Sequence, residues 1–135
     1  MGKRKRRVVT GYAQMWPREV FHIVEKNRLL KEVLDALEKP GVYVLYIDDV
    51  PHYIGKATRR LADRLFNHSK QPGDKYYNFW NFFSAFEVPK PYIDQIEAVL
   101  IAAMPTANSA SPRIRPIKIP TKAKKALAKR RQIKI

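Results

Sequence analysis

Residues 41–55 read GVYVLYIDDVPHYIG, with β-branched and aromatic side chains on each side of two aspartates. Side chains of these types favour strands, and the run over 42–47 is dense enough to form a buried one. Asp48 and Asp49 favour a turn, after which residues 50–54 return as a second strand. The stretch therefore predicts a β-hairpin.

Helices and a third strand are predicted around this hairpin. Apolar residues recur at helical spacing over 18–38, 59–68 and 92–104. Residues 79–88 are aromatic enough for a core strand, whereas 8–17 contain a glycine and a proline and are predicted to be irregular. This order predicts an α/β fold of the α+β type: a small, mainly antiparallel, three-stranded sheet flanked by helices, with an extra N-terminal helix and charged tails.

The net charge of the chain is concentrated at its ends. Lys and Arg number 27 against 12 Asp and Glu, a formal net charge of +15. Residues 3–7 supply five positive charges and residues 113–135 supply ten, and neither range contains an acidic residue. The remaining charges cancel over 8–112. Basic tails attract polyanions and so favour nucleic acid as a partner; the alternative is that they only aid solubility or targeting.

Composition excludes several classes of function. The chain has no cysteine and three histidines, which excludes disulfide scaffolds, thiol catalysis and cysteine-based zinc sites. Its longest apolar run, Ala98 to Met104, has seven residues, whereas a membrane span needs roughly 20. The basic N-terminus is not followed by an apolar stretch, so no secretory signal is predicted. We expect a soluble, cytoplasmic (intracellular) protein with no membrane partner.

One carboxylate interrupts the apolar stripe of the helix predicted over 92–104. At helical spacing Glu97 falls inside that stripe, which consists of Ile93, Ile96, Leu100, Ile101 and Met104. A buried carboxylate must be paired, protonated or bound to a metal ion. Glu97 is therefore a candidate metal ligand; the alternative is a carboxylate that reaches solvent or pairs with an arginine.

Basic side chains gather on and before the helix predicted over 59–68. Arg64 and His68 are four residues apart and share a helix face. A guanidinium can bind a phosphate through two hydrogen bonds, and a histidine can relay a proton. Further positive charges nearby are Lys56, Arg59 and Arg60. The cluster is a candidate phosphate site, although a basic helix face is more often merely solvated.

The aromatic residues allow two interpretations. Tyr43, Tyr46 and Tyr53 lie in or beside the hairpin, where packing in the core is more common than catalysis. The aromatic block over 76–86 would suit stacking on nucleic-acid bases, but its strand-like pattern favours the core. Residue type alone therefore assigns none of them to a site.

The combined pattern resembles the GIY-YIG nuclease family over about residues 40–110. The first signature of the family is matched by Gly41-Val42-Tyr43, with Val in place of Ile. The second is matched by Tyr53-Ile54-Gly55 after nine intervening residues, followed by Lys56 as in many members. The resemblance covers most of the body between the two basic tails.

Further residues of the family pattern follow in the same order. The arginine of the family is best matched by Arg64, a frequent histidine by His68, the metal-binding glutamate by Glu97 and a late asparagine by Asn108. The interval between the second signature and Arg64 is about one residue longer than usual. Competitors for the arginine role are therefore Arg59 and Arg60.

The resemblance implies a metal-dependent endonuclease that hydrolyses phosphodiester bonds in nucleic acid, with DNA the expected substrate. Glu97 would bind a divalent cation, Mg²⁺ or alternatively Mn²⁺, together with water molecules. Arg64 would clamp the scissile phosphate. Tyr43 is the expected general base and Tyr53 would hold or help to activate the water, although the division between the two phenols is open. The expected catalytic set is Tyr43, Tyr53, Arg64, His68, Glu97 and Asn108, with Asn108 bracing the site.

The prediction divides the chain into a basic arm over 1–17, an accessory helix over 18–39, a nuclease-like domain over 40–112 and a basic tail over 113–135. The side chains expected to bind nucleic acid are Lys56, Arg59, Arg60, Lys122, Lys124, Lys125, Arg130 and Arg131. Two rival functions are a non-catalytic nucleic-acid-binding protein with a degenerate nuclease fold and an interaction protein that uses an aromatic surface. Cutting both strands with one site per chain would favour a homodimer.

The loop of the hairpin decides whether the two signature tyrosines share a face, because strand side chains alternate. A two-residue loop at Asp48 and Asp49 pairs Tyr43 with Ile54 and puts Tyr53 on the opposite face. A three-residue loop pairs Tyr43 directly with Tyr53. Since catalysis needs both phenols near one phosphate, we predict the odd-length loop or an equivalent β-bulge, with Glu97 and Arg64 approaching the same sheet face.

Overall fold

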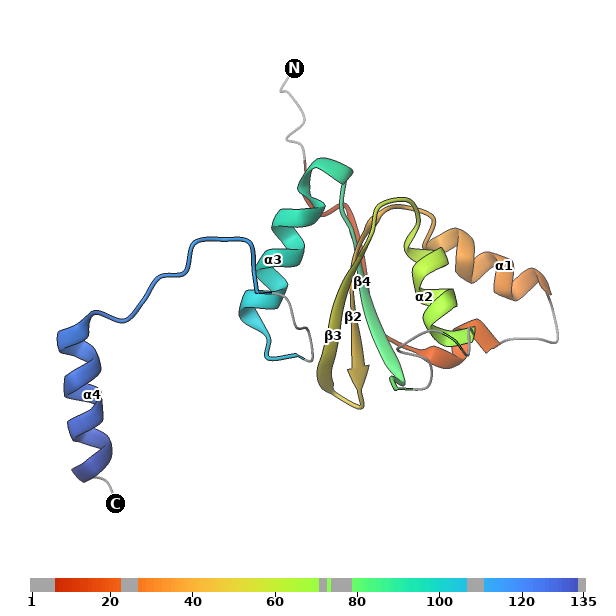
Figure 1. Ribbon diagram of the computed structural model, residues 1–135. Helices are drawn as coiled ribbons and strands as arrows, with labels where there is room; N and C mark the ends of the chain where they lie inside the picture. Colours follow the sequence, from red (N-terminus) through yellow and green to blue (C-terminus); the bar gives the residue numbers. More distant parts are fainter. Residues whose placement is uncertain (1–6, 23–26, 71–72, 74–78, 107–110, 134–135) are drawn as a thin grey trace.

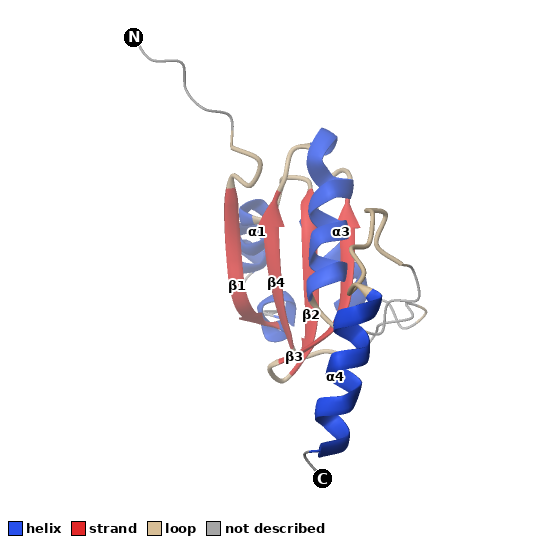
Figure 2. Cartoon of the chain, turned by 90° about the vertical axis from the view of Figure 1, so that its left-hand side faces the viewer, coloured by secondary structure: helices blue, strands red, loops and turns tan. Residues whose placement is uncertain are grey.

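The computed structural model describes residues 7–22, 27–70, 73, 79–106 and 111–133. Its elements are β1 (Gly11–Pro17), the 3₁₀ helix η1 (Arg18–His22), α1 (Asn27–Ala36), β2 (Gly41–Ile47), β3 (Val50–Ala57), α2 (Leu61–Lys70), β4 (Phe82–Glu87), the 3₁₀ helix η2 (Lys90–Tyr92), α3 (Ile93–Ala103) and α4 (Thr121–Ile133). The strands form one sheet in the order β1-β4-β2-β3, and each neighbouring pair is antiparallel (Figures 1 and 2). The predicted α+β class with a mainly antiparallel sheet is confirmed.

The sheet has a fourth strand that the sequence did not predict. Residues 11–17, expected to be irregular and part of a basic arm, pair with β4 from Gly11 opposite Glu87 to Pro17 opposite Phe82. Gly11 and Pro17 stand at the two ends of β1, and this strand lies at the edge of the sheet, where a proline is tolerated because one side of the strand needs no ladder hydrogen bonds. A bulge between Ala13 and Trp16 includes Met15, at a φ of 51°. The predicted three-stranded sheet is therefore wrong in strand number, because the sheet has four strands.

The single N-terminal helix expected over 18–39 is two shorter elements. The short η1 continues directly from β1, and α1 begins at Asn27; residues 23–26 between them lie outside the described part of the chain. Phe21 of η1 is fully buried and stacks on Phe83 of β4 with ring centroids 5.4 Å apart. The segment therefore closes one face of the sheet with an aromatic side chain rather than with one long amphipathic helix.

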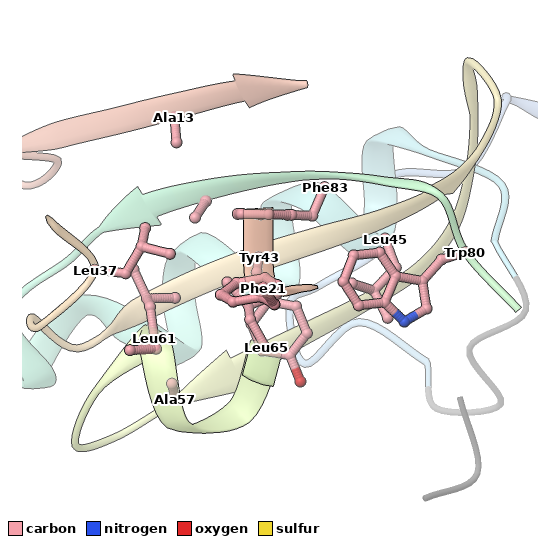
Figure 3. Packing of buried hydrophobic residues seen from close by; sticks show 12 residues of the cluster. Ala13, Phe21, Leu37, Tyr43, Leu45, Ala57, Leu61, Leu65, Trp80 and Phe83 are labelled. Atoms are coloured by element: carbon pink, nitrogen blue, oxygen red, sulfur yellow. The ribbon is translucent and has the colours of Figure 1, made fainter. Parts of the chain in front are cut away.

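Strand β2 is buried on both faces, and this divides the molecule into three layers. Tyr43 and Leu45 face α1 and α2, whereas Val42 and Val44 face α3 (Figure 1). The first face carries the larger of the two clusters of buried hydrophobic side chains, which Figure 3 shows. This cluster includes Phe21, Leu61, Leu65, Trp80 and Phe83. The second face packs against Ile93 and Ile96 of α3.

The C-terminal helix α4 is not part of the layers around the sheet. Helix α4 stands apart from the sheet and its flanking helices (Figure 1), and its side chains from Thr121 to Arg130 are all exposed. It carries basic residues around its circumference and has no apolar face to bury. Among the described helices, none is both long and apolar enough to cross a bilayer.

Gly41 is required by the contact between β2 and β4. A Cβ added to Gly41 would overlap the backbone carbonyl oxygen of Phe86. We expect Gly41→Ala to lower the free energy of unfolding by about 2–4 kcal/mol, because the central strand pair must separate. Gly73→Ala is the matched control, since a Cβ there meets no atom within 4 Å. Denaturant unfolding of both variants checks this; equal midpoints would show that the strands adjust freely.

Candidate active site

The β2–β3 hairpin contains both a two-residue turn and a bulge. Ile47 pairs with Val50 across Asp48 and Asp49, and Asp48 has a φ of 56°. The side chain of Asn81 holds the turn: its Oδ1 accepts from the Asp48 N–H at 2.7 Å, and its Nδ2 donates to the Asp48 carboxylate at 2.8 Å. The short turn is therefore fixed from the β4 side, and its length alone would have put the two signature tyrosines on opposite faces.

An extra residue in β3 restores the shared face. Tyr46 pairs with Pro51 but Leu45 pairs with Tyr53, so that His52 is the additional residue of a bulge. Tyr53 therefore lies on the same face as Tyr43, with ring centroids 6.3 Å apart. The predicted bulge is confirmed, whereas the direct pairing of the two tyrosines is wrong.

The residue paired with Tyr43 is Gly55, and the ring of Tyr43 lies over it. A Cβ on Gly55 would overlap the end of this ring at Cζ and the hydroxyl. The glycine of the second signature therefore has a steric function, because it makes room for the phenol of the first. The two signatures are thus in direct steric contact in this chain.

A buried tyrosine–histidine cluster, consisting of Tyr43, Tyr53 and His68, occupies this face of the sheet. The Tyr43 hydroxyl and Nε2 of His68 share a hydrogen bond of 2.7 Å. The ring of His68 also meets that of Tyr53 edge-on, at 6.2 Å between centroids. Tyr43 has no exposed surface and His68 is 4% exposed, whereas Tyr53 is half-buried. Tyr53 is thus the phenol of the cluster that solvent reaches.

Helix α2 places His68 in the buried tyrosine–histidine cluster. Leu61 and Leu65 anchor the helix in the core, and His68 lies one turn after Arg64, which is exposed. Of the competing arginines before α2, Arg60 lies 4.0 Å from the carboxylate of Asp63 and Arg59 is exposed.

Glu97 lies on the other side of the sheet. Helix α3 packs on the face of β2 that carries Val42 and Val44, whereas Tyr43 is on the α2 face. The expectation that Glu97 would approach the tyrosine face is therefore wrong. Helical periodicity identifies the stripe that a helix buries but not the sheet face that receives it. Both groups also border β3, an edge strand with Tyr53 on one face and Ile54 on the other.

Glu97 lines a small cavity on this second face, here called the Glu97 pocket. It has a volume of about 100 Å³ and is lined by Lys56, Asp94, Glu97, Arg113 and the apolar Ala98 and Ile101. Nζ of Lys56 donates to Oδ1 of Asp94 at 2.8 Å, and this hydrogen bond raises the pKa of Lys56 and lowers that of Asp94. Lys56 and Asp94 therefore neutralise each other at the pocket.

The carboxylate of Glu97 makes no hydrogen bond or ion pair with any residue that the structure describes. Burial raises its pKa; Lys56 and Arg113 act in the opposite direction, and Asp94 raises it further. A partly buried carboxylate without a protein partner fits a ligand of a hard cation that otherwise keeps its water molecules. The described residues contain no cluster of three or more His, Cys, Asp or Glu side chains that could hold a metal ion.

The remaining predicted residues are distributed as follows. Asn108 lies outside the described residues, as does the side chain of Arg131. Lys122, Lys124, Lys125 and Arg130 are exposed on α4. Two residues at the Glu97 pocket were not predicted. Asp94 was detectable, since it precedes Glu97 by one helical turn. Arg113 was counted only as tail charge, and no local pattern distinguishes it from the other tail residues.

The charge of Glu97 is expected to cost stability. The raised pKa means that this cost is absent below the ordinary value of 4.5 and fully present above the folded-state pKa. We therefore expect Glu97→Gln to unfold at the same or a higher temperature than the wild type at pH 7, and this difference to vanish near pH 4. Asp94→Asn is the control of opposite sign, because it removes the ion pair with Lys56 and should lower the melting temperature. A large loss of stability in Glu97→Gln would mean that the carboxylate holds the fold together.

Known proteins provide a partial match to the chain. No protein-family model matches it. UvrABC system protein C of Thermotoga maritima and that of Thermotoga sp. strain RQ2 are each 40% identical to it over 52 residues, which is 38% of this chain and 9% of the relative. The chain therefore matches less than a tenth of the length of these relatives.

Solved structures of one domain of that protein are also similar. The GIY-YIG N-terminal endonuclease domain of UvrC from Thermotoga maritima, bound to magnesium as its catalytic divalent cation, is 29% identical with a TM-score of 0.48, over 61% of this chain and 96% of that domain. A point mutant of the domain, also bound to its catalytic divalent cation, is 28% identical with a TM-score of 0.49, over 63% of this chain and 98% of that domain. Together with the two signatures, which meet on one hairpin through Tyr43 and Gly55, the 40% match over 52 residues supports the resemblance of this chain to the GIY-YIG nuclease family.

Proposed function

We propose that the chain is a cytoplasmic, metal-dependent endonuclease that hydrolyses phosphodiester bonds in nucleic acid, with DNA as the substrate. The observation that carries this proposal is the 2.7 Å hydrogen bond between Tyr43 of β2 and His68 of α2, next to the edge strand β3, whose Lys56 lines the Glu97 pocket on the other side of the sheet. A phenol paired with an imidazole can accept and pass on a proton, and a carboxylate without a partner among the described residues suits a cation. Metal-dependent phosphodiester hydrolysis uses both a base and a cation.

Glu97 would hold the divalent cation, Mg²⁺ or alternatively Mn²⁺. When bound, such a cation neutralises a non-bridging phosphate oxygen and stabilises the leaving oxygen. The Glu97 pocket supports this role by its size, since about 100 Å³ accommodates a few water molecules beside a carboxylate. Asp94 is already paired with Lys56, so that Glu97 is the carboxylate of the pocket that remains for the cation.

Tyr43 and His68 would together act as the general base. Water transfers a proton to the Tyr43 oxygen while the hydroxyl proton of Tyr43 passes to Nε2 of a neutral His68, and the resulting hydroxide attacks the phosphorus. Because Tyr43 is fully buried, this step requires that substrate binding admits a water molecule beside it. Tyr53, which is half-buried on the same face, would hold that water. Asn108 is retained as a residue that braces the site.

Phosphate binding falls to the basic side chains around the β3 edge. Arg64 on α2 is exposed and would clamp the scissile phosphate, with Arg59 and Arg60 nearby. Lys56 on β3 reaches the same edge from the α3 side. Because β3 is an edge strand, a nucleic-acid backbone that passes along it would contact residues of both faces.

Helix α4 would add affinity without selecting a sequence. Its basic side chains surround the helix and face solvent. A helix of this kind lacks the apolar face that binding to a membrane surface needs, so that a polyanion is the better partner. The residues proposed to contact phosphates are Lys122, Lys124, Lys125, Arg130 and Arg131. Cleavage of both strands with one site per chain would favour a homodimer.

Replacement of the metal ligand tests the proposed activity directly. We expect the wild type to nick supercoiled plasmid with Mg²⁺ and not with EDTA, and Glu97→Gln to lose cleavage by at least about 10³-fold while it still binds DNA. Agarose-gel nicking and filter binding measure the two properties. DNA binding without Mg²⁺-dependent nicking in the wild type would instead support a non-catalytic binding protein with a nuclease fold.

Removal of one phenol hydroxyl tests the proposed base. Tyr43→Phe should lower the single-turnover rate by about 10²–10⁴-fold, because the proton path through His68 is lost. Tyr46→Phe is the matched control, since Tyr46 lies on the same strand but packs on the α3 face. The assignment fails if the two variants cleave at the same rate.

Deletion of residues 121–135 tests the role of α4. The deletion removes seven positive charges, Lys122, Lys124, Lys125, Lys129, Arg130, Arg131 and Lys134. We expect weaker DNA binding for all sequences alike and a shallower dependence of the binding constant on salt, by about 0.9 in the logarithmic slope for each phosphate that is no longer neutralised. Fluorescence anisotropy over a salt series measures both. An altered site preference with an unchanged salt slope would show that α4 reads bases.

A further inference from the structure

The chain returns to the Glu97 pocket after α3 has ended. Ser111, Pro112 and Arg113 line the pocket together with Glu97 and Ala98. These three residues follow the stretch that resembles the GIY-YIG family, and they immediately precede the extended segment that leads to α4. A residue that belongs to the basic tail by sequence therefore forms a wall of the candidate metal pocket.

Arg113 is the basic side chain of this pocket that forms no ion pair with a described residue. Lys56 is engaged with Asp94 at 2.8 Å. The guanidinium of Arg113, in contrast, makes no hydrogen bond or ion pair with the residues that the structure describes, and its side chain is exposed. It is close enough to lower the pKa of Asp94 and that of Glu97. Its positive charge thus faces the pocket without being neutralised by one partner.

We infer that Arg113 binds a backbone phosphate of the nucleic acid at the mouth of the Glu97 pocket and positions the scissile phosphate against Glu97. This inference rests on the proposed nuclease function. The planar guanidinium can donate two parallel hydrogen bonds to one phosphate, which fixes its orientation as well as its distance. Arg113 is a positioning residue for the reaction, and the phosphate is the group that it recognises.

The path of the chain separates this role from that of α4. Seven residues lie between Arg113 and Thr121, the first residue of α4, and α4 stands apart from the body that contains the pocket (Figure 1). A duplex of six base pairs is about 20 Å long, so that one centred on the pocket extends only about 10 Å to each side. On a short duplex, Arg113 contacts phosphate while α4 makes few contacts.

The experiment measures binding of a six-base-pair DNA hairpin to the full chain in a Glu97→Gln background, where cleavage does not interfere. We expect Arg113→Ala to weaken binding about tenfold or more, as for the loss of a charge-assisted hydrogen bond, and Arg113→Lys to recover part of it. Arg115→Ala is the matched control and should change binding less than twofold. Arg115 has the same charge and is also exposed, but it lines a neighbouring groove with Ala102 and Pro116.

The same variants in the active chain complete the test. Arg113→Ala should lower the single-turnover rate at saturating DNA, whereas Arg115→Ala should not. Equal losses of binding for both variants would overturn the inference, because Arg113 would then act only as tail charge. A lowered melting temperature in Arg113→Ala without recovery by Arg113→Lys would also overturn it in favour of a structural role. If the wild type fails to cleave but the binding difference persists, the proposed function is wrong and the phosphate site stands.

Discussion

The contact between the ring of Tyr43 and Gly55 determines the rest of the candidate site. It depends on one extra residue in β3, because the bulge at His52 places Tyr43 opposite Gly55 and keeps Tyr53 on the same face. Without the bulge the two-residue turn would send Tyr53 toward α3. A side chain larger than glycine would displace the ring, and with it the hydroxyl that bonds His68 at 2.7 Å. The β2–β3 register and Gly55 are therefore both needed to place the Tyr43 ring.

Burial of β2 on both faces explains why the site is divided. The α2 face contains the tyrosine–histidine cluster and the α3 face contains Glu97, so that in the proposed reaction proton transfer and cation binding would come from different layers. Each layer is held by its own apolar core, and β3 is the strand that both layers share at the sheet edge. The relative position of the two groups therefore depends on the hairpin, which the Asn81 side chain fixes from the β4 side.

Much of this arrangement could be predicted from local sequence. The hairpin, the helices and the unusual place of Glu97 in an apolar stripe all follow from periodicity within one element. Strand β1 was missed because Gly11 and Pro17 are typical of loops, and its pairing with β4 joins segments that are far apart in the chain. The face that α3 covers and the return of Arg113 to the pocket are also long-range facts. They are set by packing and not by any local pattern.

This layout places the residues proposed to give affinity for nucleic acid apart from those proposed to carry out the reaction. The body has equal numbers of basic and acidic residues over 8–112, so that the excess charge of the chain lies in its tails. Helix α4 stands apart from the body (Figure 1), and the attraction to nucleic acid that we propose for it would weaken with salt and would not depend on sequence. The Glu97 pocket instead contains a few charged side chains that are partly buried. In such surroundings the position of each charge matters more than the total number of charges. Arg113 belongs to both regions, since it is the first residue of the basic tail over 113–135 and also lines the Glu97 pocket.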